Sequence, residues 1–99
     1  MAGFRVQPGP GGVLYLVGEL DMATAEGFPA EGLANLDGQR DLILDVSELT
    51  FLDSTGIRAL LELARLTAPK GVVLRNPRPN VDAVLEIVEI DSLGIRAER

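Results

Sequence analysis

Three adjacent residues, Asp53, Ser54 and Thr55, place a carboxylate and two hydroxyls directly before an apolar helical pattern. Four residues recur at the i, i+3, i+4, i+7 spacing of one helix face: Ile57, Leu60, Leu61 and Ala64. We therefore predict a helix from Ser54 to about Leu66, with Ser54 at or next to the N-cap. A helix N-terminus carries unpaired N–H groups and a partial positive charge, and it often holds phosphate. Ser54 is thus either a simple capping residue or an acceptor for a phosphoryl group.

Carboxylates offer a second possible chemistry. Asp21, Asp45 and Asp53 follow strand-like or connecting segments, where carboxylates in other proteins hold Mg²⁺ or accept a phosphoryl group. However, the first strand does not end in a pair of acids, and the last strand contains no Lys. Asp45 is better explained as an acceptor for loop N–H groups.

Two missing residue types restrict the catalytic options. The chain has no His and no Cys, so it lacks the commonest general base, thiolate nucleophiles, disulfides and zinc–sulfur sites. We therefore expect a protein that is not an enzyme and that uses no cofactor and no metal.

Composition narrows the class of partner. The 99 residues fit one domain spanning 1–99, and a hydrophobic fraction of 46% supports a packed core. The formal net charge of −6 disfavours direct binding to nucleic acid or to an anionic membrane surface. With neither a signal-peptide pattern nor a membrane-span pattern, we expect a soluble cytoplasmic protein without membrane association.

The first half of the chain predicts a hairpin, a weak helix and a buried strand. Phe4–Val6 and Val13–Val17 read as the two strands of a hairpin at the antiparallel edge of the sheet. Asp21 or Thr24 can cap a weak helix that runs through Phe28, and Leu33 and Leu36 continue its apolar side. We expect this helix to break near Pro29, and a turn to follow at Asp37–Gly38. The apolar segment Leu42–Val46 predicts a strand covered by helices on both faces.

The second half predicts two strand–helix units. Ser47–Leu52 is expected to be a connector before the Ser54 helix, and Val72–Leu74 is another apolar strand. Asn80 is a ready N-cap for a third helix with four residues on its apolar face: Val81, Val84, Leu85 and Val88. The order β-β-α-β-α-β-α predicts an α/β fold, a mixed sheet of four to five strands with helices packed on it.

The segment Leu52–Ile57, read with its flanking strand and helix, resembles the STAS domain, and specifically the bacterial anti-sigma factor antagonists. The resemblance spans nearly the whole chain and includes four further segments: Gly18–Asp21, Leu42–Asp45, Gly71–Leu74 and Pro79–Glu86. Asp91–Ile95 nearly repeats the Asp53–Ile57 motif, but neither a buried strand before it nor an amphipathic helix after it is predicted.

This resemblance implies partner switching in transcription regulation and stress response. The unphosphorylated domain would bind an anti-sigma factor that is also a serine kinase of the GHKL type, and so release a sigma factor. Phosphorylation of Ser54 would end the binding, and a phosphoserine phosphatase would restore it. Partner contacts near Ser54 are expected at Asp21, Asp53, Thr55 and Gly56.

Two further points bear on the partner. Leu63 and Leu66 lie off the apolar stripe, and we expect them to be exposed for partner contact. STAS domains also serve as small subunits of lipid-transport ATPases and as regulatory parts of anion transporters. A chain of this length without a membrane segment fits the transporter role poorly, and the lipid-transport subunit remains the alternative function.

Overall fold

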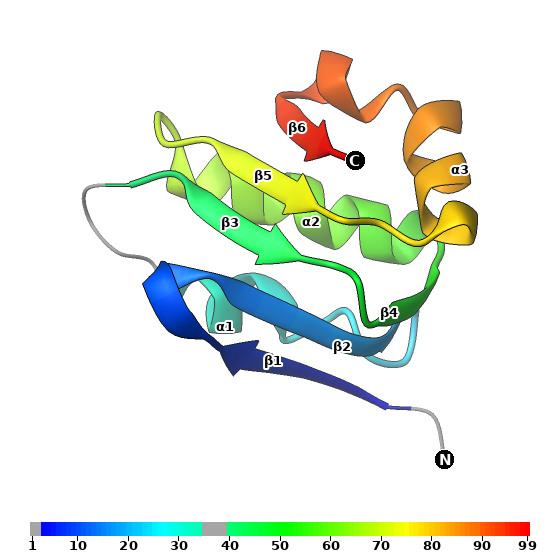
Figure 1. Cartoon of the computed structure of the whole chain (residues 1–99), viewed down its shortest axis with the longest axis horizontal. Helices are drawn as coiled ribbons and strands as arrows, with labels where there is room; N and C mark the ends of the chain where they lie inside the picture. Colours follow the sequence, from blue (N-terminus) through cyan, green and yellow to red (C-terminus); the bar gives the residue numbers. More distant parts are fainter. Residues whose placement is uncertain (1–2, 35–39) are drawn as a thin grey trace.

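The computed structural model describes residues 3–34 and 40–99 of the chain (Figure 1). The expected turn at Asp37–Gly38 and the expected apolar contacts of Leu33 and Leu36 lie outside what it describes. No helix within the described ranges is long and apolar enough to cross a membrane.

A mixed sheet forms the centre of the molecule. Its six strands are β1 (Phe4–Pro8), β2 (Leu14–Leu20), β3 (Leu42–Asp45), β4 (Leu49–Leu52), β5 (Val72–Arg75) and β6 (Ile95–Glu98). The main path runs β1-β2-β3-β5-β6, and β4 pairs with β2 beyond the end of β3. Only the β1–β2 hairpin is antiparallel within the described sheet, so the predicted antiparallel edge is confirmed.

Three α-helices accompany the sheet in the part of the chain that the structure describes. α1 (Phe28–Ala34) and the longer α2 (Ser54–Thr67) lie side by side behind it, and α3 (Pro79–Ile87) stands at the end where β4 lies (Figure 1). Two short 3-10 turns, η1 (Pro10–Gly12) and η2 (Ile90–Leu93), precede β2 and β6. The α/β class is as predicted.

The predicted cover of helices on both faces is wrong. Residues paired across a parallel sheet share a face, and Leu42 with Val72 and Leu44 with Leu74 point into the core beneath α1 and α2. The alternate pair, Ile43 and Val73, points to the opposite face, which neither α1 nor α2 covers (Figure 1). The continuous apolar run therefore reflects one helix-covered face and one face shielded by side chains.

Several predicted boundaries also need correction. Ser47–Leu52 is not only a connector, because it contains β4. The two end residues of β4 are buried and the two between them are exposed, so its sequence shows no simple alternation. The segment from Asp21 to Gly27 is a turn, and α1 begins at Phe28 with Pro29 in its first turn, where a proline is tolerated, so Pro29 does not break the helix.

The third helix begins two residues earlier than expected. Pro79 occupies its first turn, Arg78 is the N-cap residue, and the Asn80 side chain instead donates a hydrogen bond to the Thr50 carbonyl of β4 at 2.9 Å. The predicted apolar face is correct, since Val81 and Leu85 are buried and Val84 packs against the core. Asn80 therefore fastens α3 to the end of the sheet.

Candidate functional site

Two parallel strands bring the predicted site residues to one end of the sheet. Leu20 of β2 pairs with Leu52 of β4, so the chain leaves both strands at the same level. Asp21 and Asp53 are the next residues on each strand, and Ser54 follows at the start of α2. The strand that sequence reading missed is therefore the element that positions the site.

Gly56 holds the start of α2 against β2. A Cβ atom at this position would lie 2.4 Å from the carbonyl oxygen of Leu20 and 2.6 Å from a methyl carbon of Leu52. Real Cβ atoms do not approach other atoms this closely, so only glycine permits the contact. The glycine of the motif is thus a packing requirement that sets the distance between α2 and the Asp21 turn.

Asp53, and not Ser54, caps the helix. The Asp53 side chain accepts a hydrogen bond from the Gly56 N–H at 3.0 Å, and its backbone carbonyl accepts one from the Ile57 N–H at 2.9 Å. Ser54 is the first helical residue, its side chain is exposed, and its hydroxyl has no hydrogen-bond partner among the described residues. The interpretation of Ser54 as a simple cap therefore loses its structural basis.

Asp21 belongs to a tight polar turn at the end of β2. Its carboxylate accepts hydrogen bonds from the Ala23 N–H at 2.9 Å and from the Thr24 hydroxyl at 3.1 Å. The Thr24 hydroxyl also lies 2.6 Å from the Glu19 carbonyl, which accepts from it. These contacts fix the turn, and with it the position of the Asp21 carboxylate, beside α2.

An apolar groove of about 310 Å³ lies next to Thr55. Met22 lines it and is 81% exposed, and Arg58 and Ala59 line it from α2. Phe51, three residues before Ser54, is 44% exposed on β4. Sequence reading did not select Met22, Phe51 or Arg58. The pairing of β2 with β4 brings Met22 and Phe51 to the end of the sheet where α2 begins, and Arg58 lies one turn after Ser54 on α2.

Leu63 does not belong to this surface. Its side chain is fully buried, and it packs between α2 and α1, where it would lie 2.9 Å from a Cβ at Gly32. The expected exposure of Leu63 is therefore wrong, while Leu66 is exposed as expected. The buried face of α2 is therefore rotated relative to the predicted apolar stripe. Leu60 and Leu63 form its centre, and Leu61 is only partly buried.

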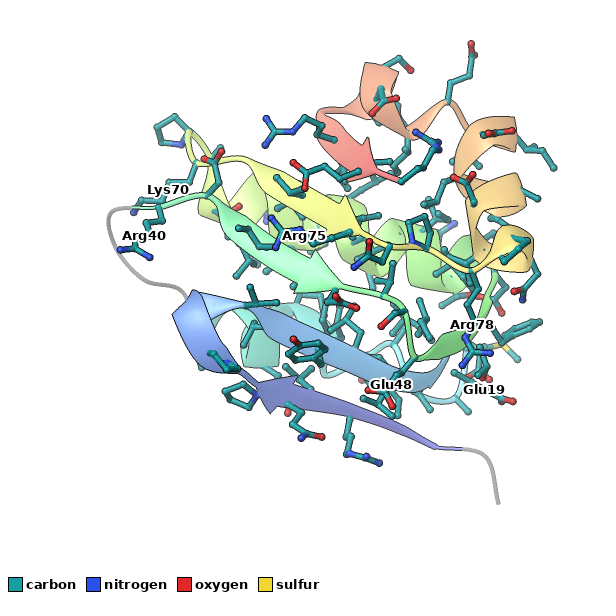
Figure 2. The ribbon with its side chains drawn as sticks, in the orientation of Figure 1. Glu19, Arg40, Glu48, Lys70, Arg75 and Arg78 are labelled. Carbon is teal, nitrogen blue, oxygen red and sulfur yellow. The ribbon has the colours of Figure 1, made fainter. Side chains whose placement is uncertain are left out.

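Charge is unevenly distributed along the sheet. Glu19 and Glu48 lie at the end where α2 begins, together with Arg78, whereas Arg40 and Lys70 lie at the opposite end (Figure 2). The Arg78 side chain donates a hydrogen bond to the Ser47 carbonyl at 2.9 Å. Ser54 therefore opens onto the more acidic end of the molecule.

Asp45 has a structural role away from this surface. Its carboxylate accepts hydrogen bonds from the Ser47 N–H at 2.9 Å and the Asn76 side chain at 3.1 Å. Burial opposes its ionisation, but the hydrogen bonds from Ser47 and Asn76 and the charge of Arg75 together lower the pKa of Asp45 below 3.8. The prediction that Asp45 serves loop N–H groups is confirmed.

The carboxylate-site interpretation finds no support in the geometry. Asp21, Asp45 and Asp53 each accept hydrogen bonds from their own loop or helix. Across residues 3–34 and 40–99, no three acidic side chains form a group suited to a metal ion. The three carboxylates are used to shape the backbone.

The second copy of the motif has another conformation. Asp91–Leu93 lies in η2 and is followed by β6, and the Ser92 hydroxyl donates a hydrogen bond to the Glu89 carbonyl at 2.7 Å. Its hydroxyl is therefore engaged where that of Ser54 is not. Ser92 is a natural control for any chemistry assigned to Ser54.

Comparison with known proteins gives a consistent picture. A family model described as "Mlab, STAS domain" matches residues 5–95. The putative anti-sigma factor antagonist BtrV of Bordetella bronchiseptica is 37% identical over 78 residues, which cover 76% of this chain and 67% of BtrV. The structure of the anti-sigma factor antagonist SpoIIAA in its unphosphorylated form has a similar fold, with a TM-score of 0.58 and 19% identity, covering 98% of this chain and 88% of SpoIIAA.

Proposed function

The chain belongs to the STAS domain family, and we propose that it is an anti-sigma factor antagonist whose binding is controlled by phosphorylation of Ser54. In its unphosphorylated form it binds an anti-sigma factor that is also a serine kinase of the GHKL type, and a sigma factor is released. A phosphoserine phosphatase reverses the modification. The domain itself is a binding module without catalytic activity.

The observation that carries the proposal is the state of the Ser54 hydroxyl. It is exposed at the first position of α2 and free of partners among the described residues, because Asp53 provides the cap. A kinase active site can therefore reach it without unfolding the helix. Thr55 is half-buried beside the groove and is a poorer acceptor.

Electrostatics supplies the switch. A phosphate at Ser54 adds about two negative charges next to Asp53, at the end of the sheet that already holds Glu19 and Asp21. The N-terminus of α2 stabilises the phosphate locally, so the domain stays folded. A partner seated on this end would meet like-charge repulsion and would have to desolvate the phosphate. Binding is lost while the fold is kept.

The partner would dock on the apolar side chains around Ser54. Met22 and Phe51 are large and exposed; Met22 follows the end of β2 by two residues, and Phe51 lies on β4 three residues before Ser54. Exposed apolar side chains next to a modifiable hydroxyl suit a partner that must sense the modification. Met22→Ala is expected to weaken binding without affecting phosphorylation by a saturating kinase.

A capture experiment with matched baits tests the proposal. Ser54→Ala protein, which resists phosphorylation, should retain a GHKL-type kinase from native cytosol, and Ser54→Asp should retain much less. Ser92→Asp makes the same chemical change in the second copy of the motif and should behave like the parent. With the captured kinase, phosphorylation should map to Ser54 by mass spectrometry. Equal labelling of Thr55 or Ser92 in a Ser54→Ala background would refute the assignment.

A lipid-transport ATPase subunit is the second candidate, because STAS domains also serve as small subunits of such complexes and the chain belongs to this family. The same capture experiment separates the two functions. Recovery of a transport ATPase, equally by Ser54→Ala and Ser54→Asp baits, would favour the second candidate.

A further inference from the structure

We propose a binding site for a small, hydroxyl-bearing organic oxyanion on the sheet face opposite α1 and α2. A depression of about 430 Å³ lies there. Its lining includes three basic residues, two acids and two apolar residues: Arg40, Arg75, Arg96, Asp41, Glu98, Ile43 and Val73. Ile43 and Val73 alternate along their strands with the core residues Leu44 and Leu74, so the depression lies on the sheet face opposite α2 and this inference does not depend on the proposed function.

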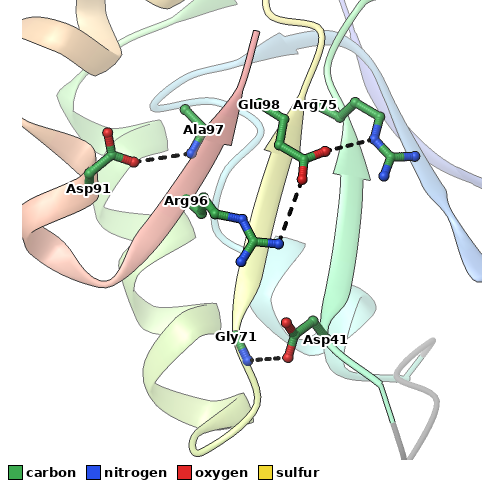
Figure 3. A network of polar contacts seen from close by, with 7 residues as sticks. All are labelled: Asp41, Gly71, Arg75, Asp91, Arg96, Ala97 and Glu98. Carbon is green, nitrogen blue, oxygen red and sulfur yellow. Dashed lines mark hydrogen bonds and ion pairs between the residues drawn. The ribbon is translucent and has the colours of Figure 1, made fainter.

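Glu98 positions two of the arginines. Arg75 Nε lies 3.2 Å from one carboxylate oxygen of Glu98, and Arg96 Nη2 lies 3.6 Å from the other (Figure 3). Each guanidinium group engages Glu98 through one nitrogen, so both terminal nitrogens of Arg75 and two nitrogens of Arg96 keep unused donors. Such forks match the oxygens of a phosphate or a carboxylate.

The strand register brings these groups together. Val73 pairs with Ile43 on one side and with Arg96 on the other, so all three lie on this face at one level. Arg75 and Glu98 pair two residues further along. The arginines therefore stand on rigid strands above an apolar floor, as a preformed site requires.

The remaining groups define the ligand. The basic residues Arg40, Arg75 and Arg96 outnumber Asp41 and Glu98 by one, so the depression is cationic within a chain of net charge −6. One oxygen of Asp41 accepts from the Gly71 N–H at 3.0 Å, and the other is available for a ligand hydroxyl (Figure 3). A phosphate ester or a hydroxy acid carries both groups on a small body that the half-buried Ile43 can contact, while Val73 is buried.

An NMR titration tests this site. We would add ribose 5-phosphate to ¹⁵N-labelled protein at constant ionic strength and, in separate arms, malate and neutral ribose. Saturable shifts are expected at the amides of Ile43, Val73 and Arg96 with one or both oxyanions, but not with ribose. The arm that saturates at the lower concentration distinguishes phosphate esters from carboxylates.

Variants make the result specific. Arg75→Gln and Arg96→Gln should each weaken binding roughly tenfold, because each loses charge-assisted hydrogen bonds. Arg65→Gln removes the same charge from the exposed face of α2 and should leave binding unchanged. Thermal melting confirms that each variant is folded. Absence of saturation, equal weakening by Arg65→Gln, or shifts confined to the start of α2 would overturn the proposal.

Discussion

Replacing Gly56 by alanine tests whether the contact between α2 and β2 fixes the site. The added methyl group would lie 2.4 Å from the Leu20 carbonyl oxygen and 2.6 Å from Leu52. Neither neighbour yields easily, because Leu20 is fully buried and pairs with Leu52 in the sheet. The start of α2 must therefore move away from β2.

The expected cost follows from two opposing effects. Overpacking costs about 1–3 kcal/mol, and a clash with backbone belongs at the upper end of that range. Alanine recovers about 1 kcal/mol through its better helix propensity. The free energy of unfolding should thus fall by roughly 2 kcal/mol, which corresponds to a melting temperature lower by roughly 8–16 °C for a domain of this size.

Chemical unfolding in urea, followed by circular dichroism, measures this change. Gly27→Ala is the matched control, because a Cβ there meets nothing within 4 Å and the backbone of Gly27 is not in the left-handed region. It should change the free energy of unfolding by less than about 0.5 kcal/mol. A Gly56→Ala protein as stable as the parent, or a Gly27→Ala protein equally destabilised, would refute this reasoning.

Three further predictions concern the cap, the core and the acid response. Asp53→Ala should lower the free energy of unfolding by about 0.5–2 kcal/mol and Ser54→Ala by less than about 0.5 kcal/mol; equal losses in urea titrations would mean that the cap is shared. Leu60→Ala should lower the free energy of unfolding by about 2–5 kcal/mol, and Leu66→Ala, at an exposed position, should lower it much less. Similar melting curves for the two variants would contradict the assigned core. Folding lowers the pKa of Asp45 below its ordinary value of 3.8. The ionised carboxylate therefore stabilises the folded state above pH 3.8, and this stabilisation is lost as the pH falls through the lower pKa of the folded protein. The stability difference between the parent and Asp45→Asn should therefore shrink in acid, and a pH-independent difference would exclude this linkage.

The α/β class, the hairpin and the helix at Ser54 could be predicted from local pattern. Strong apolar runs and a 3.6-residue period survive in any tertiary context, so β3, β5 and α2 were recognisable. β4 was not recognisable, because only its two end residues, Leu49 and Leu52, are buried. It forms a strand by pairing with β2. Its existence depends on pairing between distant segments.

The grouping of the candidate site residues could be predicted in part for the same reason. Asp53, Ser54, Thr55 and Gly56 are consecutive, so their grouping needs no tertiary information. The proximity of Asp21 followed from the resemblance, and the pairing of Leu20 with Leu52 now gives its physical cause. The exposed side chains of Met22 and Phe51, from two distant segments, carried no local signal.

The error at Leu63 shows the limit of a helical wheel. A wheel finds an apolar stripe but does not say what lies on either side of it. α1 packs beside α2 and extends the buried face past the stripe, so Leu63 is covered while Leu61 is partly open. A second helix, itself weakly predicted, therefore decided which residues were available to a partner.

Asp53 caps α2, and the Ser54 hydroxyl takes no part in that cap. This separation affects how long the protein should survive in the cell. Degradation of small domains follows the population of the unfolded state. Because Asp53 makes the cap, modifying the Ser54 hydroxyl removes no capping hydrogen bond, so it should not raise that population. Proteases would then remove the modified form no faster than the unmodified one. Each molecule could therefore be used through many rounds of signalling.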